Sequence, residues 1–117
     1  MFKVKNNAFY VTRGDSGSFL LSFKDYKFKN GDTIEFKIYE KNGLDSEPIL
    51  IKEKTVQASG PVDNIKIELF GGDTLLGEIE NKVVEYWYEV ILNGDKTVFC
   101  YDERGPKIFY LYPGGLD

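Results

Sequence analysis

The sequence contains no histidine, and this absence removes much of the usual chemistry of small enzymes. Histidine is the commonest general base and metal ligand, and it activates the nucleophile in Ser-His and Cys-His pairs. The sequence also lacks a P-loop, a G-x-G-x-x-G motif and a D-x-[DN]-x-[DN]-G calcium loop. We therefore expect no catalytic residue, no cofactor and no metal site. A cleft that holds two carboxylates roughly 5–10 Å apart would instead favour glycosidase-like chemistry.

Cysteine is almost absent as well, because Cys100 is the only one in the chain. No internal disulfide can form, and a reducing compartment is the natural setting. Cys100 alternates with Val98 on an expected strand, a position that favours a small buried side chain over a reactive thiol.

Long apolar runs and an excess of positive charge are also missing. Met1 is followed by FKVKNNAF, which lacks the apolar stretch of a signal peptide. No run approaches the roughly 20 residues of a membrane span. The 15 basic and 19 acidic residues give a net charge of −4, without the concentrated basic face that binds nucleic acid. We expect neither a membrane nor a nucleic acid as a partner.

Apolar side chains alternate with polar ones through most of the sequence, and no window shows a sustained helical stripe. The 117 residues suit one domain, 1–117. Turn residues recur about every ten to fifteen positions, which suits a sandwich or barrel. We predict an all-β fold: a single antiparallel β-sandwich, immunoglobulin-like or Greek-key, with about seven to nine strands. One short helical turn is expected in 71–78, capped by Asp73 or Thr74 and ended by Gly77.

Three alternating segments define the expected core. Residues 32–41 place Ile34, Phe36 and Ile38 on one face, with Glu35, Lys37 and Tyr39 on the other. Residues 62–70 place Ile65, Ile67 and Leu69 inward. Residues 83–93 place one set of side chains on one side (Val84, Tyr86, Tyr88, Val90 and Leu92) and a second set on the opposite side (Glu85, Trp87, Glu89 and Ile91). Asn93-Gly94 then predicts a type I′ hairpin turn into 97–102. Residues 106–113 read as a strand that is apolar on both faces, which lies centrally or meets a partner.

Trp87 is the most informative side chain, since it lies opposite the long apolar face of its strand and is either covered by a second layer or exposed. Exposed aromatics would indicate a partner surface, because they carry much of the energy of interfaces. Phe99, Phe109 and Leu111 raise the same question. These four residues are the candidate interface. The eight tyrosines and one tryptophan also leave open a carbohydrate- or peptide-binding module.

The tripeptide Arg13-Gly14-Asp15 is the one match to a known recognition signal, that of integrin ligands. It separates two alternating runs, AFYVT and SGSFLLSF, and Gly14 suits a chain reversal. An integrin ligand is also secreted, whereas no export signal is evident here. We therefore interpret the motif as a turn.

A family pattern is visible in the same residues. FYVTRGDSGSFLLSF, followed by FKNGDTIEFKIYEK, resembles the start of the N-terminal domain of baseplate upper proteins and related small tail proteins of phages and prophages of Gram-positive bacteria. LFGGDTLLGEIENKVVEYWYEVILNGDKTV and GPKIFYLYP are also similar to that family, with a D-T-x-x-L turn, an aromatic strand, a hairpin and a final strand.

The resemblance implies a β-sandwich that docks to other phage tail or baseplate proteins, or to copies of itself, in a virion assembled in the bacterial cytoplasm. It carries over no catalytic or ligand residue. No coiled-coil stalk or receptor-binding region follows within the 117 residues, so no direct role with a host receptor is expected.

Overall fold

The computed structural model describes residues 1–23, 25–40, 47–94, 96–99, 101–102, 105–106 and 108–114, with only the backbone described for those between 95 and 107. The chain is mostly β, and its one helical element among these residues is the 3-10 turn η1 (Gly71–Thr74). The all-β prediction is confirmed.

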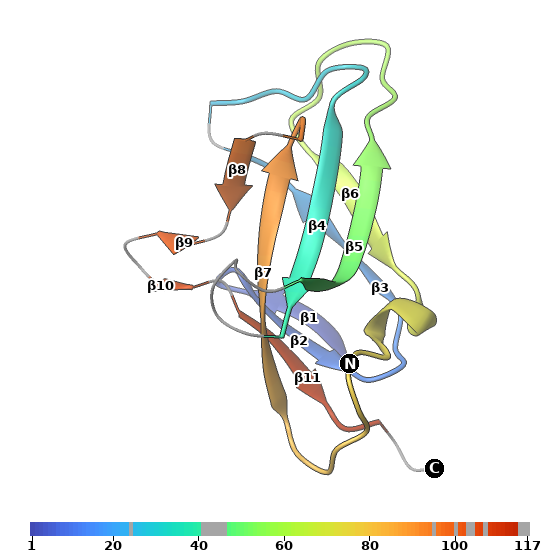
Figure 1. The fold of residues 1–117 in the computed structure, drawn as a ribbon. Coiled ribbons are helices and arrows are strands. Elements are labelled where there is room, and N and C mark those ends of the chain that lie inside the picture. Colours follow the sequence, from blue (N-terminus) through green and yellow to red (C-terminus); the bar gives the residue numbers. More distant parts are fainter. Residues whose placement is uncertain are drawn as a thin grey trace.

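Eleven strands are present in the described residues. They are β1 (Phe2–Lys5), β2 (Ala8–Thr12), β3 (Gly17–Leu21), β4 (Thr33–Tyr39), β5 (Pro48–Thr55), β6 (Ile65–Leu69), β7 (Val84–Leu92), β8 (Lys96–Phe99), β9 (Tyr101–Asp102), β10 (Gly105–Pro106) and β11 (Ile108–Tyr112). The larger sheet has the order β1-β2-β11-β7-β4-β5, with β8 also paired to β7. The strand pairs β3–β6 and β9–β10 form two smaller sheets. Figure 1 shows β7, β4 and β5 side by side, with η1 to their right.

The larger sheet is mixed, so the prediction of a wholly antiparallel fold is wrong. β11 pairs in parallel with β2 and antiparallel with β7. Alternation within a strand gives the face of each side chain but does not give the direction of its neighbour. The central place expected for the last strand is correct, because β11 lies between two partners and is covered at both edges.

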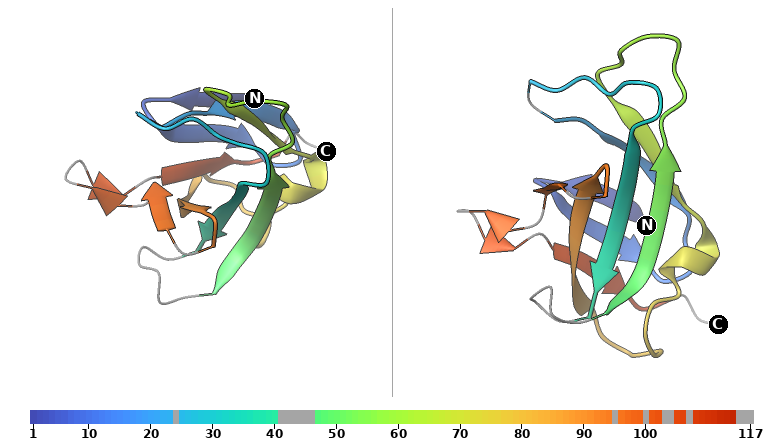
Figure 2. Two further views of the ribbon diagram at one scale, coloured as in Figure 1. Left: turned by 90° about the horizontal axis from the view of Figure 1, so that it is seen from above. Right: turned by 45° about the horizontal axis from the view of Figure 1, so that its top comes forward.

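One hydrophobic cluster joins the larger sheet to the β3–β6 sheet. Phe9 lies at its centre, with ring centroids 4.8–5.3 Å from four other rings, those of Phe19, Phe36, Tyr88 and Phe109. Ile67 and Leu69 of β6 belong to the same cluster. Figure 2 shows β3 and β6 on one side of the larger sheet. The face of the larger sheet that points to this cluster is therefore its inner face.

The predicted inward positions of β4, β6 and β7 are confirmed, since those side chains are buried apart from half-buried Val84. Tyr39 and Glu89 lie on the outer face, as the alternation predicts, and both are only 4% exposed. The Tyr39 hydroxyl donates a hydrogen bond to Glu89 Oε1, so the two polar groups are buried together.

β5 was not expected from the sequence. Its first half carries the consecutive apolar residues Ile49, Leu50 and Ile51, and its second half is charged, so neither half shows clear alternation. It forms the edge of the larger sheet beyond β4, where strands tolerate charged side chains.

The Asn93-Gly94 hairpin is confirmed by φ angles of 54° and 79° at the two residues. Asn93 also contacts Asp32, a 3% exposed carboxylate that accepts hydrogen bonds from Asn93 Nδ2 (3.3 Å), the Tyr26 hydroxyl (2.6 Å) and the Lys29 N–H (3.0 Å). Burial alone would raise the pKa of Asp32, but these hydrogen bonds hold it below its usual value. Asp32 therefore joins the hairpin to the loop that precedes β4.

The helical turn begins slightly before the predicted cap. Asp73 lies within η1, and its carboxylate accepts the Phe70 N–H (2.7 Å) and pairs with Lys52 Nζ (2.8 Å). Gly77 lies beyond the turn with a φ of 60°. Within the described residues no helix has the length and apolar character needed to cross a bilayer.

Candidate functional site

The Arg13-Gly14-Asp15 segment forms the turn between β2 and β3. Gly14 has a φ of 88°, which glycine adopts without strain. The Arg13 guanidinium donates hydrogen bonds to the carbonyl oxygens of Leu76 and Gly77, the latter at 3.2 Å. These bonds fix the arginine side chain against the segment that follows η1.

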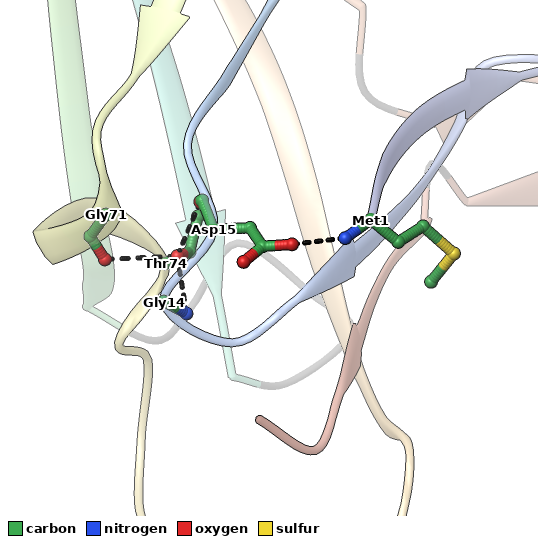
Figure 3. Close-up of polar contacts among 5 residues, drawn as sticks. All are labelled: Met1, Gly14, Asp15, Gly71 and Thr74. Atoms are coloured by element: carbon green, nitrogen blue, oxygen red, sulfur yellow. Dashed lines mark hydrogen bonds and ion pairs between the residues drawn. The ribbon is translucent and has the colours of Figure 1, made fainter. Parts of the chain in front are cut away.

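Thr74 of η1 also holds this turn (Figure 3). Its Oγ1 accepts the Gly14 N–H at 2.9 Å and lies 2.9 Å from the Asp15 carbonyl and 3.1 Å from the Gly71 carbonyl, either of which can accept its proton. Thr74 is fully buried. The Asp15 carboxylate forms an ion pair with the terminal ammonium of Met1.

The guanidinium of the tripeptide is therefore already engaged within the chain, whereas the Asp15 side chain is 46% exposed. An adhesion motif must present both its guanidinium and its carboxylate to a partner, and the Arg13 guanidinium is bound to its own chain. This geometry is that of a structural turn.

The outer face of the larger sheet carries a group of half-buried apolar and aromatic side chains. We call the outer patch the set of Tyr10 on β2, Trp87 on β7, and Ile108, Tyr110 and Tyr112 on β11. In the strand registers Tyr10 lies opposite Tyr110, and Ile108 lies opposite Trp87. The patch therefore crosses three adjacent strands.

Two candidate interface residues lie elsewhere. Phe109 is fully buried and Leu111 is 4% exposed, because both point to the inner face, where Phe109 lies opposite Tyr86 and Leu111 opposite Val84. Neither side chain offers a surface to a partner. The surface of β11 is instead made by its alternate residues, which belong to the outer patch.

Trp87 is half-buried, between the two outcomes that the sequence left open. Its indole Nε1 is buried and has no hydrogen-bond partner, a condition found at no other buried side-chain nitrogen or oxygen in the described part of the chain. A buried donor without an acceptor costs about 1–3 kcal/mol. The outer patch thus contains a group that an acceptor would stabilise.

Phe99 and Cys100 give less information. The backbone of Phe99 pairs with Val90 in the β7–β8 hairpin, but its side chain lies outside the described residues. Cys100 also lies outside them.

Described residues line at least two hollows of the surface. One, of about 130 Å³, is lined by Val4, Asn7, Phe9, Phe19, Leu20, Leu21, Ser22, Tyr88 and Val90. The other is an open depression of about 510 Å³, lined by Glu40, Gly77, Glu78, Glu80, Val84, Glu85 and Tyr86. Four carboxylates, those of Glu40, Glu78, Glu80 and Glu85, belong to residues that line the depression. Among the described residues no group of three or more acidic or thiol side chains is placed to hold a metal ion.

Sequence reasoning missed Tyr10, Tyr110 and Tyr112. β11 is apolar on both faces, so alternation alone does not identify its exposed side. The hydroxyl groups supply the missing signal, because a tyrosine hydroxyl needs water or a polar partner, whereas Phe109 and Leu111 need neither. Burial and the nearby Glu85 raise the pKa of Tyr110, which keeps its hydroxyl protonated.

In comparisons with known proteins, no family model matches the chain, and no curated protein or solved structure shows significant similarity to it.

Proposed function

We propose that the protein is a structural or assembly component of a phage or prophage tail or baseplate that acts by docking to other subunits. In this proposal the larger sheet and the β3–β6 sheet form a sandwich of immunoglobulin-like or Greek-key type, and the outer patch makes the contact. The sequence resemblance supplies the biological setting. The observation that supports docking is the group of half-exposed aromatic side chains around Trp87.

The chemistry of the outer patch suits a protein partner. Tyrosine and tryptophan are enriched among the residues that dominate binding energy, because they bury a large area with few rotatable bonds.

A carbohydrate-binding module is the second candidate, because three tyrosines and one tryptophan share the patch. The Tyr10 and Tyr110 rings, however, stack on each other with centroids 5.1 Å apart and planes at 20°. One face of each ring is therefore already covered, whereas sugars bind to open aromatic faces. This geometry favours a protein partner over a glycan.

Catalysis is the weakest candidate. The charged groups that line the acidic depression are all carboxylates, and Tyr86, also in its lining, has a pKa raised by burial and by Glu40. The depression thus supplies no cation and no histidine. We propose that the protein is not an enzyme.

The test begins with the genes beside the one that encodes this chain. Each neighbouring tail or baseplate product is co-expressed with the chain and the complexes are measured by size-exclusion chromatography with light scattering. A Tyr110→Ser/Tyr112→Ser variant should bind at least about tenfold more weakly. Ile51→Ser, at a 51% exposed position on the edge strand β5, is the matched control and should bind as the wild type does.

Two outcomes would count against the proposal. One is a gene neighbourhood without tail, holin or endolysin genes. The other is a complex that the Tyr110→Ser/Tyr112→Ser variant forms with unchanged affinity. Saturable binding on a glycan array that the same variant abolishes would favour the carbohydrate module instead.

A further inference from the structure

The outer patch is flanked on its two sides by charges of opposite sign. In the strand registers Lys3 of β1 lies opposite Tyr10, Tyr10 lies opposite Tyr110, and Tyr110 lies opposite Glu85 of β7. Paired residues share one face of a sheet, so these four side chains form a single row across four strands of the outer face. Neighbouring strands lie about 4.8 Å apart, which separates the two charged positions by about 14 Å. The stacked tyrosine rings lie between them.

Both ends of this row are exposed, and charge of the same sign lies beside each of them. Lys3 and Glu85 are exposed, and neither forms an ion pair with another described residue. Lys5, also exposed, points to the same face two residues further along β1. Glu85 lines the acidic depression together with three other glutamates. The outer patch is therefore positive on its β1 side and negative on its β7 side.

This polarity is complementary to itself in one orientation. Two copies whose outer faces meet can be related by a two-fold axis that runs either along the strands or across them. An axis along the strands, between Tyr10 and Tyr110, reverses the row, so that Lys3 of each copy faces Glu85 of the other. An axis across the strands keeps the order of the row and sets like charges opposite each other, which is repulsive. Charge complementarity therefore selects the axis along the strands.

We propose that the partner of the outer patch is a second copy of this chain, related by a two-fold axis along β2 and β11, with Lys3 of each copy paired to Glu85 of the other. The inference rests on the proposed docking function, because it names the partner of the same patch. The charges at the two sides fix the orientation, and the aromatic side chains between them supply the contact.

The size of the contact predicts a weak dimer. Four strands about 4.8 Å apart, each of about four residues, make a face of only about 20 by 15 Å. This is smaller than one side of a standard interface, so we expect a dissociation constant of about 0.1–1 mM. Two copies that each carry a net charge of −4 also repel each other outside the contact.

The test is sedimentation equilibrium of the full chain up to about 2 mM in low salt, where surface charges are least screened. Lys3→Glu makes both sides of the patch negative, and Glu85→Lys makes both sides positive. Each variant should therefore dimerise at least about tenfold more weakly than the wild type. Lys54→Glu and Glu53→Lys are the matched controls, because they make the same charge changes at exposed positions of β5, outside the patch, and should dimerise as the wild type does.

A mixture of the two patch variants gives the sharpest result. In a mixed pair, the glutamates of the Lys3→Glu chain face the lysines of the Glu85→Lys chain, so both contacts join opposite charges. The mixed pair should form with nearly wild-type affinity, although neither variant pairs with itself. In NMR titrations, amide signals of β2 and β11 in an isotope-labelled Lys3→Glu chain should shift when the unlabelled Glu85→Lys chain is added.

Two results would overturn the inference. One is a wild type that stays monomeric over the whole concentration range, and the other is a dimer whose affinity neither patch variant changes and the mixture does not restore. A monomer that still binds a neighbouring tail or baseplate product through Tyr110 and Tyr112 refutes the second copy as partner and leaves the proposed function intact. A dimer with these properties from a gene neighbourhood without tail genes supports the inference and counts against the tail function.

Discussion

Replacement of Thr74 by valine should loosen the Arg13-Gly14-Asp15 turn without creating a cavity. Valine has nearly the shape of threonine but lacks Oγ1, which accepts the Gly14 N–H and donates to a neighbouring carbonyl. A donor left without a partner costs about 1–3 kcal/mol. Because Thr74 is fully buried, water does not replace the lost hydroxyl at its own position. We expect the free energy of unfolding to fall by about 1–3 kcal/mol.

Urea unfolding followed by fluorescence measures this loss, because Trp87 is the only tryptophan. With a typical slope for a small domain, the midpoint should fall by roughly 0.5–1.5 M. Thr55→Val is the control, since Thr55 is exposed at the end of β5 and should change the free energy by less than about 0.5 kcal/mol. If both variants unfold at the same urea concentration, the hydroxyl does not hold the turn and the structural explanation of the motif fails.

Three further predictions test other parts of the fold. The folded-state pKa of Asp32 lies below the unfolded value of about 3.9, so its contribution to stability is complete above about pH 4 and is lost as the pH falls through the folded pKa. The urea midpoints of wild type and Asp32→Asn should therefore converge as the pH falls below about 4. A Cβ at Gly17 would lie 2.3 Å from Cγ of Phe2, so Gly17→Ala should cost about 1–3 kcal/mol, and much less in a Phe2→Ala background. Burial raises the pKa of Tyr88, so the contribution of its protonated hydroxyl to stability is present below about pH 10 and is lost above it. The Tyr88→Phe variant should therefore lose less stability at alkaline pH than the wild type does.

Local patterns in the sequence were sufficient for the strands with one apolar face. β4, β6 and β7 have strict alternation, and their inward residues are the ones the alternation indicates. The Asn93-Gly94 turn was equally local, because both positive φ angles are favoured by those two residues. β5 and the parallel pairing of β11 were not predictable in this way, since the first lacks alternation and the second depends on a strand about 100 residues earlier in the chain.

In the candidate interface, too, local patterns predict some features, whereas others depend on distant parts of the chain. Both faces of β11 are apolar, so the sequence left open whether the candidate interface residues Phe109 and Leu111 are covered or exposed, and the register with β7 turns them inward. If the pairing of β11 with β7 slipped by one residue, every side chain of β11 would move to the other face of the sheet. Phe109 stacks on Phe9 of β2 in the core, a contact between distant parts of the chain that no local pattern reveals.

The meaning of the Arg-Gly-Asp tripeptide also depends on residues far from it in sequence. Thr74 and Leu76, which bind Gly14 and Arg13, lie 60 and 63 positions away from them along the chain. The approach is so close that a Cβ at Gly71 would lie 2.8 Å from the Gly14 carbonyl oxygen. The same three residues on an isolated loop would leave the guanidinium free. A short motif therefore specifies a turn or an adhesion signal only together with the packing around it, and here the segment after β6 makes it a turn.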